Sequence, residues 1–237
     1  MNAQPMNSHE PKVFVALDLD LPREAEAIAE NLSGLGLGFK LGPRLMLREG
    51  MSLVRSIAKH GQVFIDCKHF DIPSTMESAV RAAFEAGASY STIHTLAGPQ
   101  ALKKMAEVEA ELSRERAFRV LAVTVLTSFS QDSLPIHLKD SKIESLVEAL
   151  AKESRANGVK SFVCSPHEAK RLREAIPDSF LVTPGIRPEG SSTGDQVRIE
   201  TPKAAKLAGS SALVVGRPIL EAADRRAMAE KILADFN

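Results

Sequence analysis

Short apolar runs rich in β-branched residues alternate with longer amphipathic stretches along the whole chain. Eight such runs predict strands, at residues 12–18, 37–41, 62–68, 90–95, 119–125, 161–164, 180–183 and 212–215. Several of them are apolar at successive positions, which is typical of strands that are buried on both faces of a parallel sheet. The stretches between the runs are long enough for helices.

The clearest helix is predicted over residues 141–157. Apolar side chains recur there at the i, i+3, i+4 spacing of one buried stripe, formed by Ile143, Leu146, Val147, Leu150 and Ala151. Gly158 follows where a helix commonly ends in a left-handed conformation, and Gly87 does the same after residues 75–86. Further helices are predicted over residues 99–114 and 219–236.

Strand–helix alternation repeated eight times without a break in composition predicts a single (β/α)₈ barrel, the TIM barrel. We expect residues 12–237 to form this one domain, preceded by a flexible tail at residues 1–11. A doubly wound open sheet is the alternative fold. It is disfavoured because no glycine-rich nucleotide-binding fingerprint follows the first predicted strand.

Composition narrows the class of protein further. The 237 residues include 44% hydrophobic and 25% charged residues, which predicts a well-formed core. A formal net charge of zero and only 5% aromatic residues argue against a nucleic-acid or anionic-membrane partner. No apolar run approaches the roughly 20 residues of a membrane-spanning helix, and the first residues lack a signal peptide's apolar segment. With only Cys67 and Cys164, a disulfide framework is not expected, and a reducing cytoplasm fits best.

Polar side chains gather where the predicted strands end. They are Asp18, Lys40, Asp66, Lys68, His94, Thr127, Ser128, Arg187 and Arg217. The first halves of the same strands are mostly Val, Ile, Leu and Phe. Because barrels of this kind carry their active sites at the carboxyl ends of the strands, this asymmetry predicts a functional site there.

The segment DCKHFD, residues 66–71, is the strongest candidate for chemistry. In a regular strand Asp66 and Lys68 share one face, and Cys67 points to the opposite face, where it packs between barrel and helices. Lys40 ends the preceding strand and should lie near Asp66. Asp71 lies beyond the strand end, where a loop can direct it toward a ligand or toward a neighbouring subunit. An ordinary surface ion-pair cluster is the alternative reading, which the position at strand ends disfavours.

A second signal follows the last two predicted strands. Residues 184–198, PGIRPEGSSTGDQVR, form a long polar loop with glycines that suits a closing lid. Gly216, Arg217 and Pro218 open the last predicted helix, where backbone N–H groups and a guanidinium make a phosphate site. A flexible loop followed by a helix cap is the alternative.

A metal site is not expected from the histidines. The six of them are scattered, and none has a partner at the i, i+4 spacing of zinc ligands. His94 at the end of the fourth strand is a candidate for catalysis, but a hydrogen-bonded structural histidine is the preferred interpretation.

Taken in order, these motifs resemble the orotidine 5′-monophosphate (OMP) decarboxylase family. The resemblance is carried by VALD at 15–18, FKLG at 39–42, DCKHFDIPST at 66–75, TVLTS at 124–128, TPGIRPEG with GDQVR at 183–198, and VVGRPI at 214–219. It spans almost the whole chain. The DxKxxDIP block and the PGIR, GDQ and GRPI set are specific, whereas VALD and LTS are weak alone.

The resemblance implies a (β/α)₈ barrel that decarboxylates OMP to UMP and CO₂, the last step of UMP synthesis, with no metal or other cofactor. It implies a homodimer with composite sites. Lys68 would protonate C6 of the pyrimidine, and Asp66 and the partner subunit's Asp71 would flank the departing carboxylate. Lys40 would complete the charged array.

The remaining roles implied by the resemblance concern substrate binding. Asp18 and Lys40, with the partner subunit's Thr75, would hold the ribose hydroxyls. Thr127 and Ser128 would lie at the pyrimidine. The phosphate would be bound by Arg187, Gln196, Gly216 and Arg217, with the loop around Gln196 closing over it.

Departures from the family pattern fall in loops. Ser74 replaces a common Asn, residues 96–99 replace a glycine pair, and residues 131–141 lack a common glycine. One rival is a magnesium-dependent sugar-phosphate decarboxylase or aldolase of the same superfamily. Such relatives carry a metal-binding carboxylate at the end of strand two, where this chain has Lys40, a cation that would repel Mg²⁺. A non-catalytic phosphate-binding barrel is the other rival, and it would not need Asp66 and Lys68.

Overall fold

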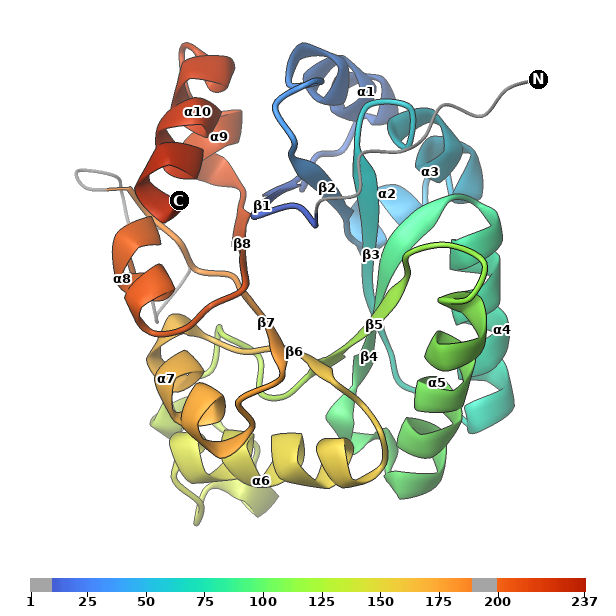
Figure 1. The fold of residues 1–237 in the computed structure, drawn as a ribbon, viewed down its shortest axis with the longest axis vertical. Coiled ribbons are helices and arrows are strands. Elements are labelled where there is room, and N and C mark those ends of the chain that lie inside the picture. Colours follow the sequence, from blue (N-terminus) through green and yellow to red (C-terminus); the bar gives the residue numbers. More distant parts are fainter. Residues whose placement is uncertain (1–9, 189–199) are drawn as a thin grey trace.

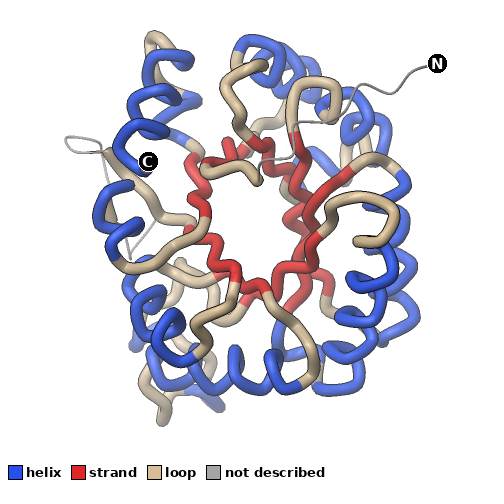
Figure 2. The backbone as a smooth tube through the Cα atoms, viewed as in Figure 1, coloured by secondary structure: helices blue, strands red, loops and turns tan. Residues whose placement is uncertain are grey.

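Eight parallel strands close into a barrel in the order of the sequence, with helices around them (Figures 1 and 2). The structure is a computed structural model that describes residues 10–188 and 200–237. The strands are β1 Val13–Ala16, β2 Gly38–Leu41, β3 Gln62–His69, β4 Ala88–His94, β5 Arg119–Val123, β6 Ser161–Val163, β7 Phe180–Thr183 and β8 Ala212–Val215. The predicted (β/α)₈ barrel is confirmed.

The helices form the outer layer of the barrel (Figure 2). They are α1 Pro22–Asn31, α2 Pro43–Met46, α3 Met51–Ile57, α4 Pro73–Glu85, α5 Pro99–Leu112, α6 Ile143–Ala156, α7 Pro166–Ala175, α8 Pro202–Leu207, α9 Arg217–Leu220 and α10 Arg225–Phe236. Many begin with proline in the first turn, where its missing N–H is not needed. Gly87 and Gly158 follow α4 and α6 with φ of 103° and 94°, the left-handed helix ends that the sequence predicts.

The prediction of one helix over residues 219–236 is wrong, because two helices occupy this region. Asp224 caps the second one, α10, by accepting a hydrogen bond from the backbone N–H of Ala227 at 3.0 Å. Arg225 Nε donates to the backbone oxygen of Leu220 at 2.9 Å, which satisfies a carbonyl at the end of α9. The cap formed by Asp224 therefore starts a second helix within the region that the apolar pattern predicted as one helix.

Large side chains fill the interior of the barrel below the polar strand ends. The rings of Phe14 and Phe64 pack edge to face with centroids 5.3 Å apart, and those of Phe14 and Tyr90 at 4.9 Å. Gly38 on β2 is required here, because a Cβ atom at this position would lie 2.4 Å from the Phe14 ring. This aromatic cluster therefore places apolar side chains next to the charged residues at the strand ends.

A bulge interrupts the pairing of β3 with β4. Residues 66–68 of β3 lie opposite a single residue of β4, Thr92, between regular pairs on either side. Lys68 lies inside this bulge with a φ of 48°, and no other non-glycine residue in the described ranges has a positive φ. The sequence prediction assumed a regular strand here. Cys67 nevertheless packs against the core between barrel and helices, as expected.

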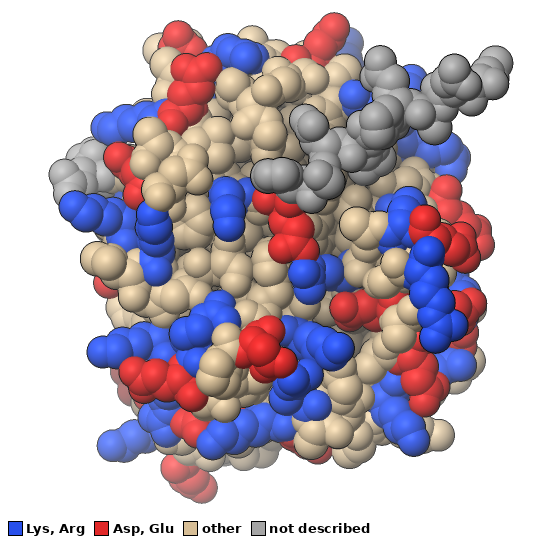
Figure 3. Space-filling model, viewed as in Figure 1, with Lys and Arg blue, Asp and Glu red and all other residues tan. Residues whose placement is uncertain are grey.

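Four further expectations concern the N-terminal tail, membrane-spanning helices, surface charge and the cysteines. The tail expected at residues 1–11 lies almost wholly outside the described residues. Within residues 10–188 and 200–237, no helix combines the length and the apolar character that crossing a membrane requires. Acidic and basic side chains are interspersed on the face that Figure 3 shows. Both cysteines, Cys67 and Cys164, are free thiols.

Candidate active site

A cavity of about 680 Å³ opens at the carboxyl ends of the strands. It brings together most of the site residues predicted from the sequence, namely Asp18, Lys40, Asp66, Lys68, Thr127, Ser128, Arg187, Gly216 and Arg217. These residues come from six strand ends and the loops after them. The barrel therefore gathers side chains that are up to two hundred positions apart in the sequence.

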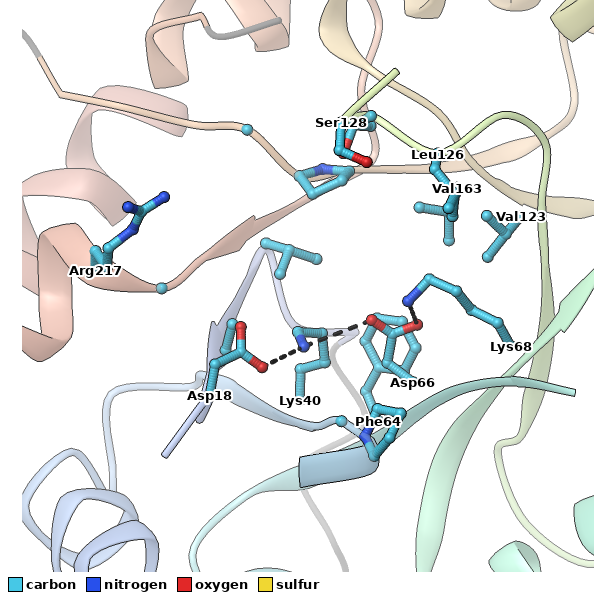
Figure 4. A pocket seen from close by; sticks show the side chains of 18 of the residues that line it. Asp18, Lys40, Phe64, Asp66, Lys68, Val123, Leu126, Ser128, Val163 and Arg217 are labelled. Carbon is cyan, nitrogen blue, oxygen red and sulfur yellow. Dashed lines mark hydrogen bonds and ion pairs between the residues drawn. The ribbon is translucent and has the colours of Figure 1, made fainter. Parts of the chain in front are cut away.

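Four of these residues form a continuous chain of alternating charge. Lys40 Nζ lies 3.0 Å from Asp18 Oδ1 and 3.5 Å from Asp66 Oδ2. Lys68 Nζ donates to Asp66 Oδ1 at 2.9 Å. Figure 4 shows these contacts one after another across the site, with Asp66 between the two lysines. The predicted proximity of Lys40, Asp66 and Lys68 is thus confirmed by the geometry of one chain.

Burial makes this array electrostatically strong. Lys40 is only 7% exposed, and burial alone would lower its pKa, but Asp66 and Asp18 outweigh burial and hold the pKa above its usual value. Burial would also raise the pKa of Asp66. The charges of Lys40 and Lys68, with hydrogen bonds from Lys68 and Thr92, instead hold it below its usual value. Lys40 and Asp66 are therefore both ionised at neutral pH.

Thr92 is a residue of this site that sequence reasoning missed. Its hydroxyl lies 2.8 Å from the backbone nitrogen of Lys68 and 3.1 Å from Asp66 Oδ1. Thr92 is completely buried and is not among the residues that line the cavity. One sequence feature could have identified Thr92. It is a polar residue within a predicted strand, and that strand follows the one that carries Asp66 and Lys68.

The opposite side of the cavity is cationic. Figure 4 shows Arg217 across the pocket from Lys68, with Asp18 and Lys40 between them. Arg187 is 8% exposed, and its Nη1 donates to the backbone oxygen of Ile186 at 2.8 Å. Gly216 precedes the short helix α9, and its backbone also borders the cavity. This side of the cavity suits an anionic group, as the sequence predicts.

Two predicted site residues lie outside the cavity of a single chain. Asp71 is exposed, and its Oδ1 accepts a hydrogen bond from the backbone N–H of Ile72 at 2.7 Å. Thr75 is exposed in the first turn of α4. Neither lines the pocket that holds Lys68. A third predicted residue, Gln196, lies outside the described residues together with most of the expected lid.

His94 does not line the cavity. Its Nδ1 accepts a hydrogen bond from the backbone N–H of Leu96 at 3.2 Å, and its ring packs against Phe70 with centroids 5.8 Å apart. Burial, and then the charge of Lys68, lowers the pKa of His94. The geometry agrees with the structural interpretation of this histidine.

Metal ligands are not grouped in the described parts of the chain. No three or more His, Cys, Asp or Glu side chains lie there in positions that could hold a metal ion. At the end of β2 the cavity presents the ammonium of Lys40, a cation that would repel Mg²⁺.

The fold and the cavity together define a class of protein. It is a (β/α)₈ barrel whose carboxyl-end pocket joins a buried lysine–aspartate array to a cationic region suited to an anionic group. The pocket can present an ammonium to a reacting carbon while arginines hold a distant anionic group.

Comparison with known proteins identifies the family. The Orotidine 5′-phosphate decarboxylase / HUMPS family matches residues 11–232. The chain belongs to this family. It is 44% identical over 228 residues to the Orotidine 5′-phosphate decarboxylase of Rhodopseudomonas palustris strain CGA009. The aligned region covers 95% of this chain and 93% of the relative. It is 40% identical to that of Trichlorobacter lovleyi, with 95% of both chains covered.

A solved structure agrees with this assignment. The crystal structure of Orotidine 5′-phosphate decarboxylase from Lactobacillus acidophilus superimposes with a TM-score of 0.84 at 35% identity. The superposition covers 96% of this chain and all of the other. The fold and the family that the sequence motifs imply are both confirmed.

Proposed function

We propose that this protein decarboxylates orotidine 5′-monophosphate to UMP and CO₂, the last step of UMP synthesis. The observation that carries the proposal is the buried Lys40–Asp66–Lys68 array in a cavity that also holds Arg187 and Arg217. Relatives that share 40% and 44% of their residues with this chain bear the name of that enzyme. A barrel that only bound phosphate would not need the charged array.

The array supplies a route for the reaction. Loss of CO₂ breaks the bond between C6 and the carboxylate and leaves the electron pair on C6. The ammonium of Lys68 stabilises this developing carbanion and then transfers a proton to C6. Lys68 regains a proton from solvent. Asp66 Oδ1 accepts a hydrogen bond from Lys68 Nζ at 2.9 Å, which fixes the position of the ammonium that the step requires.

The carboxylate of Asp66 has a second role in this proposal. With the partner subunit's Asp71, it lies beside the substrate carboxylate, whose charge moves to C6 as CO₂ departs. Repulsion between carboxylates then disfavours the bound ground state more than the transition state. Lys40, between Asp18 and Asp66, keeps the buried acid ionised and so maintains this repulsion.

We assign substrate binding to the rest of the cavity. Asp18 and Lys40 hold the ribose, and Thr127 and Ser128 border the pyrimidine. Arg187, Gly216 and Arg217 bind the phosphate, together with Gln196. Support comes from the position of the described members around one cavity, with Arg217 across from Lys68 (Figure 4). Binding energy from the distant phosphate then serves to assemble the charged site.

We further propose a homodimer in which the partner subunit's Asp71 and the partner subunit's Thr75 complete each site. Within one chain both residues are exposed and outside the cavity. Beside them lie large apolar side chains that one chain leaves uncovered, with Phe70 64%, Ile72 63% and Leu96 44% exposed. Apolar residues in this number at one edge are typical of a protein interface. A twofold contact there brings two equivalent composite sites together.

The activity is tested by mixing purified protein with OMP in the presence of EDTA and following the loss of the substrate's ultraviolet absorbance. We expect turnover without added metal. Lys68→Ala should nearly abolish it while UMP still binds, because the ammonium acts mainly on the transition state. Lys103→Ala, on an exposed position of α5, is the matched control and should be fully active. No turnover of OMP by the wild type would refute the proposal. No observation favours the magnesium-dependent alternative.

Mixed dimers test the shared site. Lys68→Ala and Asp71→Ala should each be inactive alone. Co-expression at equal levels makes half of the dimers mixed, and one site in each mixed dimer has both residues intact, so roughly a quarter of wild-type activity should return. Verified mixed dimers as inactive as their parents would place the action of Asp71 within its own chain.

We propose that residues 12–237 act as one catalytic domain, which the closed barrel supports. We also propose a cytoplasmic location. Two free thiols, Cys67 and Cys164, are in keeping with a reducing compartment.

A further inference from the structure

The bulge in β3 leaves one side chain of β4 opposite three residues. Thr92 faces residues 66–68, and its hydroxyl occupies the place where regular ladder hydrogen bonds are missing. Thr92 Oγ1 lies 2.8 Å from the backbone nitrogen of Lys68, 3.1 Å from Asp66 Oδ1 and 3.4 Å from the backbone oxygen of Ile65. One hydroxyl therefore contacts the backbone of one charged residue and the side chain of the other.

The direction of each hydrogen bond follows from the chemistry of the groups. The N–H of Lys68 can only donate, so the Thr92 oxygen accepts it. The single hydroxyl hydrogen then goes to the nearer and charged acceptor, Asp66 Oδ1. Thr92 is completely buried, so water does not replace these bonds when the hydroxyl is removed.

The same contacts determine where the ammonium of Lys68 lies. Lys68 has a φ of 48°, a conformation that a non-glycine residue keeps only when its surroundings enforce it. The bond from its backbone N–H to Thr92 contributes to that enforcement. At the other end of the side chain, Lys68 Nζ donates to Asp66 Oδ1, the same oxygen that Thr92 holds. Thr92 thus holds both the backbone of Lys68 and the acceptor of its ammonium.

We propose that Thr92 is a positioning residue for the decarboxylation step, acting through Asp66 and Lys68 without contacting the substrate. This inference rests on the proposed function. Because Thr92 does not line the cavity, its loss should affect the reacting geometry and spare the binding of ribose and phosphate.

Three variants separate positioning from a general effect of altering a buried threonine. Thr92→Val keeps the shape and removes both hydrogen bonds, and Thr92→Ser keeps the hydroxyl. Thr95→Val is the matched control, because Thr95 is also buried, at 2% exposure, and its hydroxyl has no hydrogen-bond partner among the described residues. The measurements are kcat and KM for OMP, the Kd of UMP, and the thermal unfolding midpoint of each variant.

We expect Thr92→Val to lower kcat by about 10- to 100-fold, since a displacement of about 1 Å of a reacting group has effects of this size. KM and the Kd of UMP should change by less than about threefold, because ground-state contacts are retained. Thr92→Ser should recover most of the lost kcat, and Thr95→Val should retain kcat within about twofold of the wild type.

The outcomes distinguish this inference from the proposed function. A wild-type protein that does not turn over OMP refutes the proposed function and the positioning role with it. An active wild type with normal kcat in Thr92→Val refutes the positioning role alone. So do equal losses in Thr92→Val and Thr95→Val, or a loss that Thr92→Ser does not relieve. Thr92→Ala takes the place of Thr92→Val if the valine variant does not fold.

Discussion

The buried contact between Lys40 and Asp66 offers a direct test of the electrostatics of the site. We consider Lys40→Met, which removes the ammonium and keeps most of the stem, and Asp66→Asn, which removes the charge and keeps the shape. Each single variant leaves the other charge buried with one partner fewer. The double variant removes both charges. We therefore expect the double variant to be less destabilised than the sum of the two single variants.

The structure gives the size of this effect. Lys40 Nζ and Asp66 Oδ2 are 3.5 Å apart, and their side chains are 9% and 15% exposed. Two unit charges at that distance attract by about 5 kcal/mol at an effective dielectric constant of about 20, and desolvation of both groups offsets much of this gain. Asp18 stays in contact with Lys40 when Asp66 is changed, but its side chain is 57% exposed, so solvent screens this contact more than the one with Asp66.

Because attraction and desolvation partly cancel, each single variant should lower the free energy of unfolding by about 3 kcal/mol. This value is near the lower end of the usual cost of removing one partner of a buried ion pair. The coupling between the two positions should be about 2 kcal/mol. The pKa of Asp66 is lowered in the folded protein, so its contribution is complete above its ordinary value of 3.8 and is lost as pH falls through the folded value. A measurement at pH 7 therefore records the full coupling.

The assay is urea unfolding of the four proteins, followed by far-ultraviolet circular dichroism. All four are measured at one protein concentration, because the stability of the proposed dimer would depend on concentration. Free energies that add to within about 0.5 kcal/mol would show that the two charges do not interact, and would refute the argument. A stabilised Lys40→Met protein would also refute it.

Three further predictions address other parts of the molecule. Arg217→Ala should weaken binding of UMP far more than binding of phosphate-free orotidine, measured by calorimetry, because a charge-assisted contact to phosphate is lost; equal losses would place Arg217 outside the phosphate site. Burial raises the pKa of Glu109 from 4.5 to about 6, so ionising it opposes folding above pH 4.5. Glu109→Gln can still accept the hydrogen bond from Val120 N. It should therefore raise the free energy of unfolding by about 2 kcal/mol at pH 7 and leave it unchanged below pH 4.5. A gain in stability that is independent of pH would contradict this prediction. Gly38→Ala should lower stability by about 1–3 kcal/mol, measured from the urea midpoint, because its Cβ would meet the Phe14 ring at 2.4 Å; an unchanged midpoint would show that the ring can move.

The sequence was sufficient for the barrel and for most of the cavity because both depend on local patterns. Apolar runs mark each strand, and Asp18, Lys40 and Asp66 stand out as polar residues where those runs end. Strand order follows from the rules of parallel connections, so neighbouring strand ends could be paired in advance. The proximity of Lys68 to Asp66 was also expected, but the regular strand on which that expectation rested is interrupted by the bulge at residues 66–68.

Other features depend on contacts that a local pattern does not contain. The bulge at residues 66–68 is defined only by the register of β3 against β4, and the role of Thr92 depends on that register. The boundary between α9 and α10 depends on the Asp224 side chain turning back to cap a new helix. In the proposed dimer, the position of Asp71 relative to a reacting substrate is set by the contact between two subunits and not by a local pattern.

The aromatic cluster inside the barrel also provides a spectroscopic probe. The chain has no tryptophan and a single tyrosine, Tyr90, which is 2% exposed with its ring 4.9 Å from that of Phe14. All intrinsic tyrosine emission therefore comes from one ring at the centre of the barrel, with no tryptophan to mask it. Burial, and then the charge of Glu10, raises the pKa of its phenol, so ionisation in alkaline solution would report when the barrel interior opens to solvent.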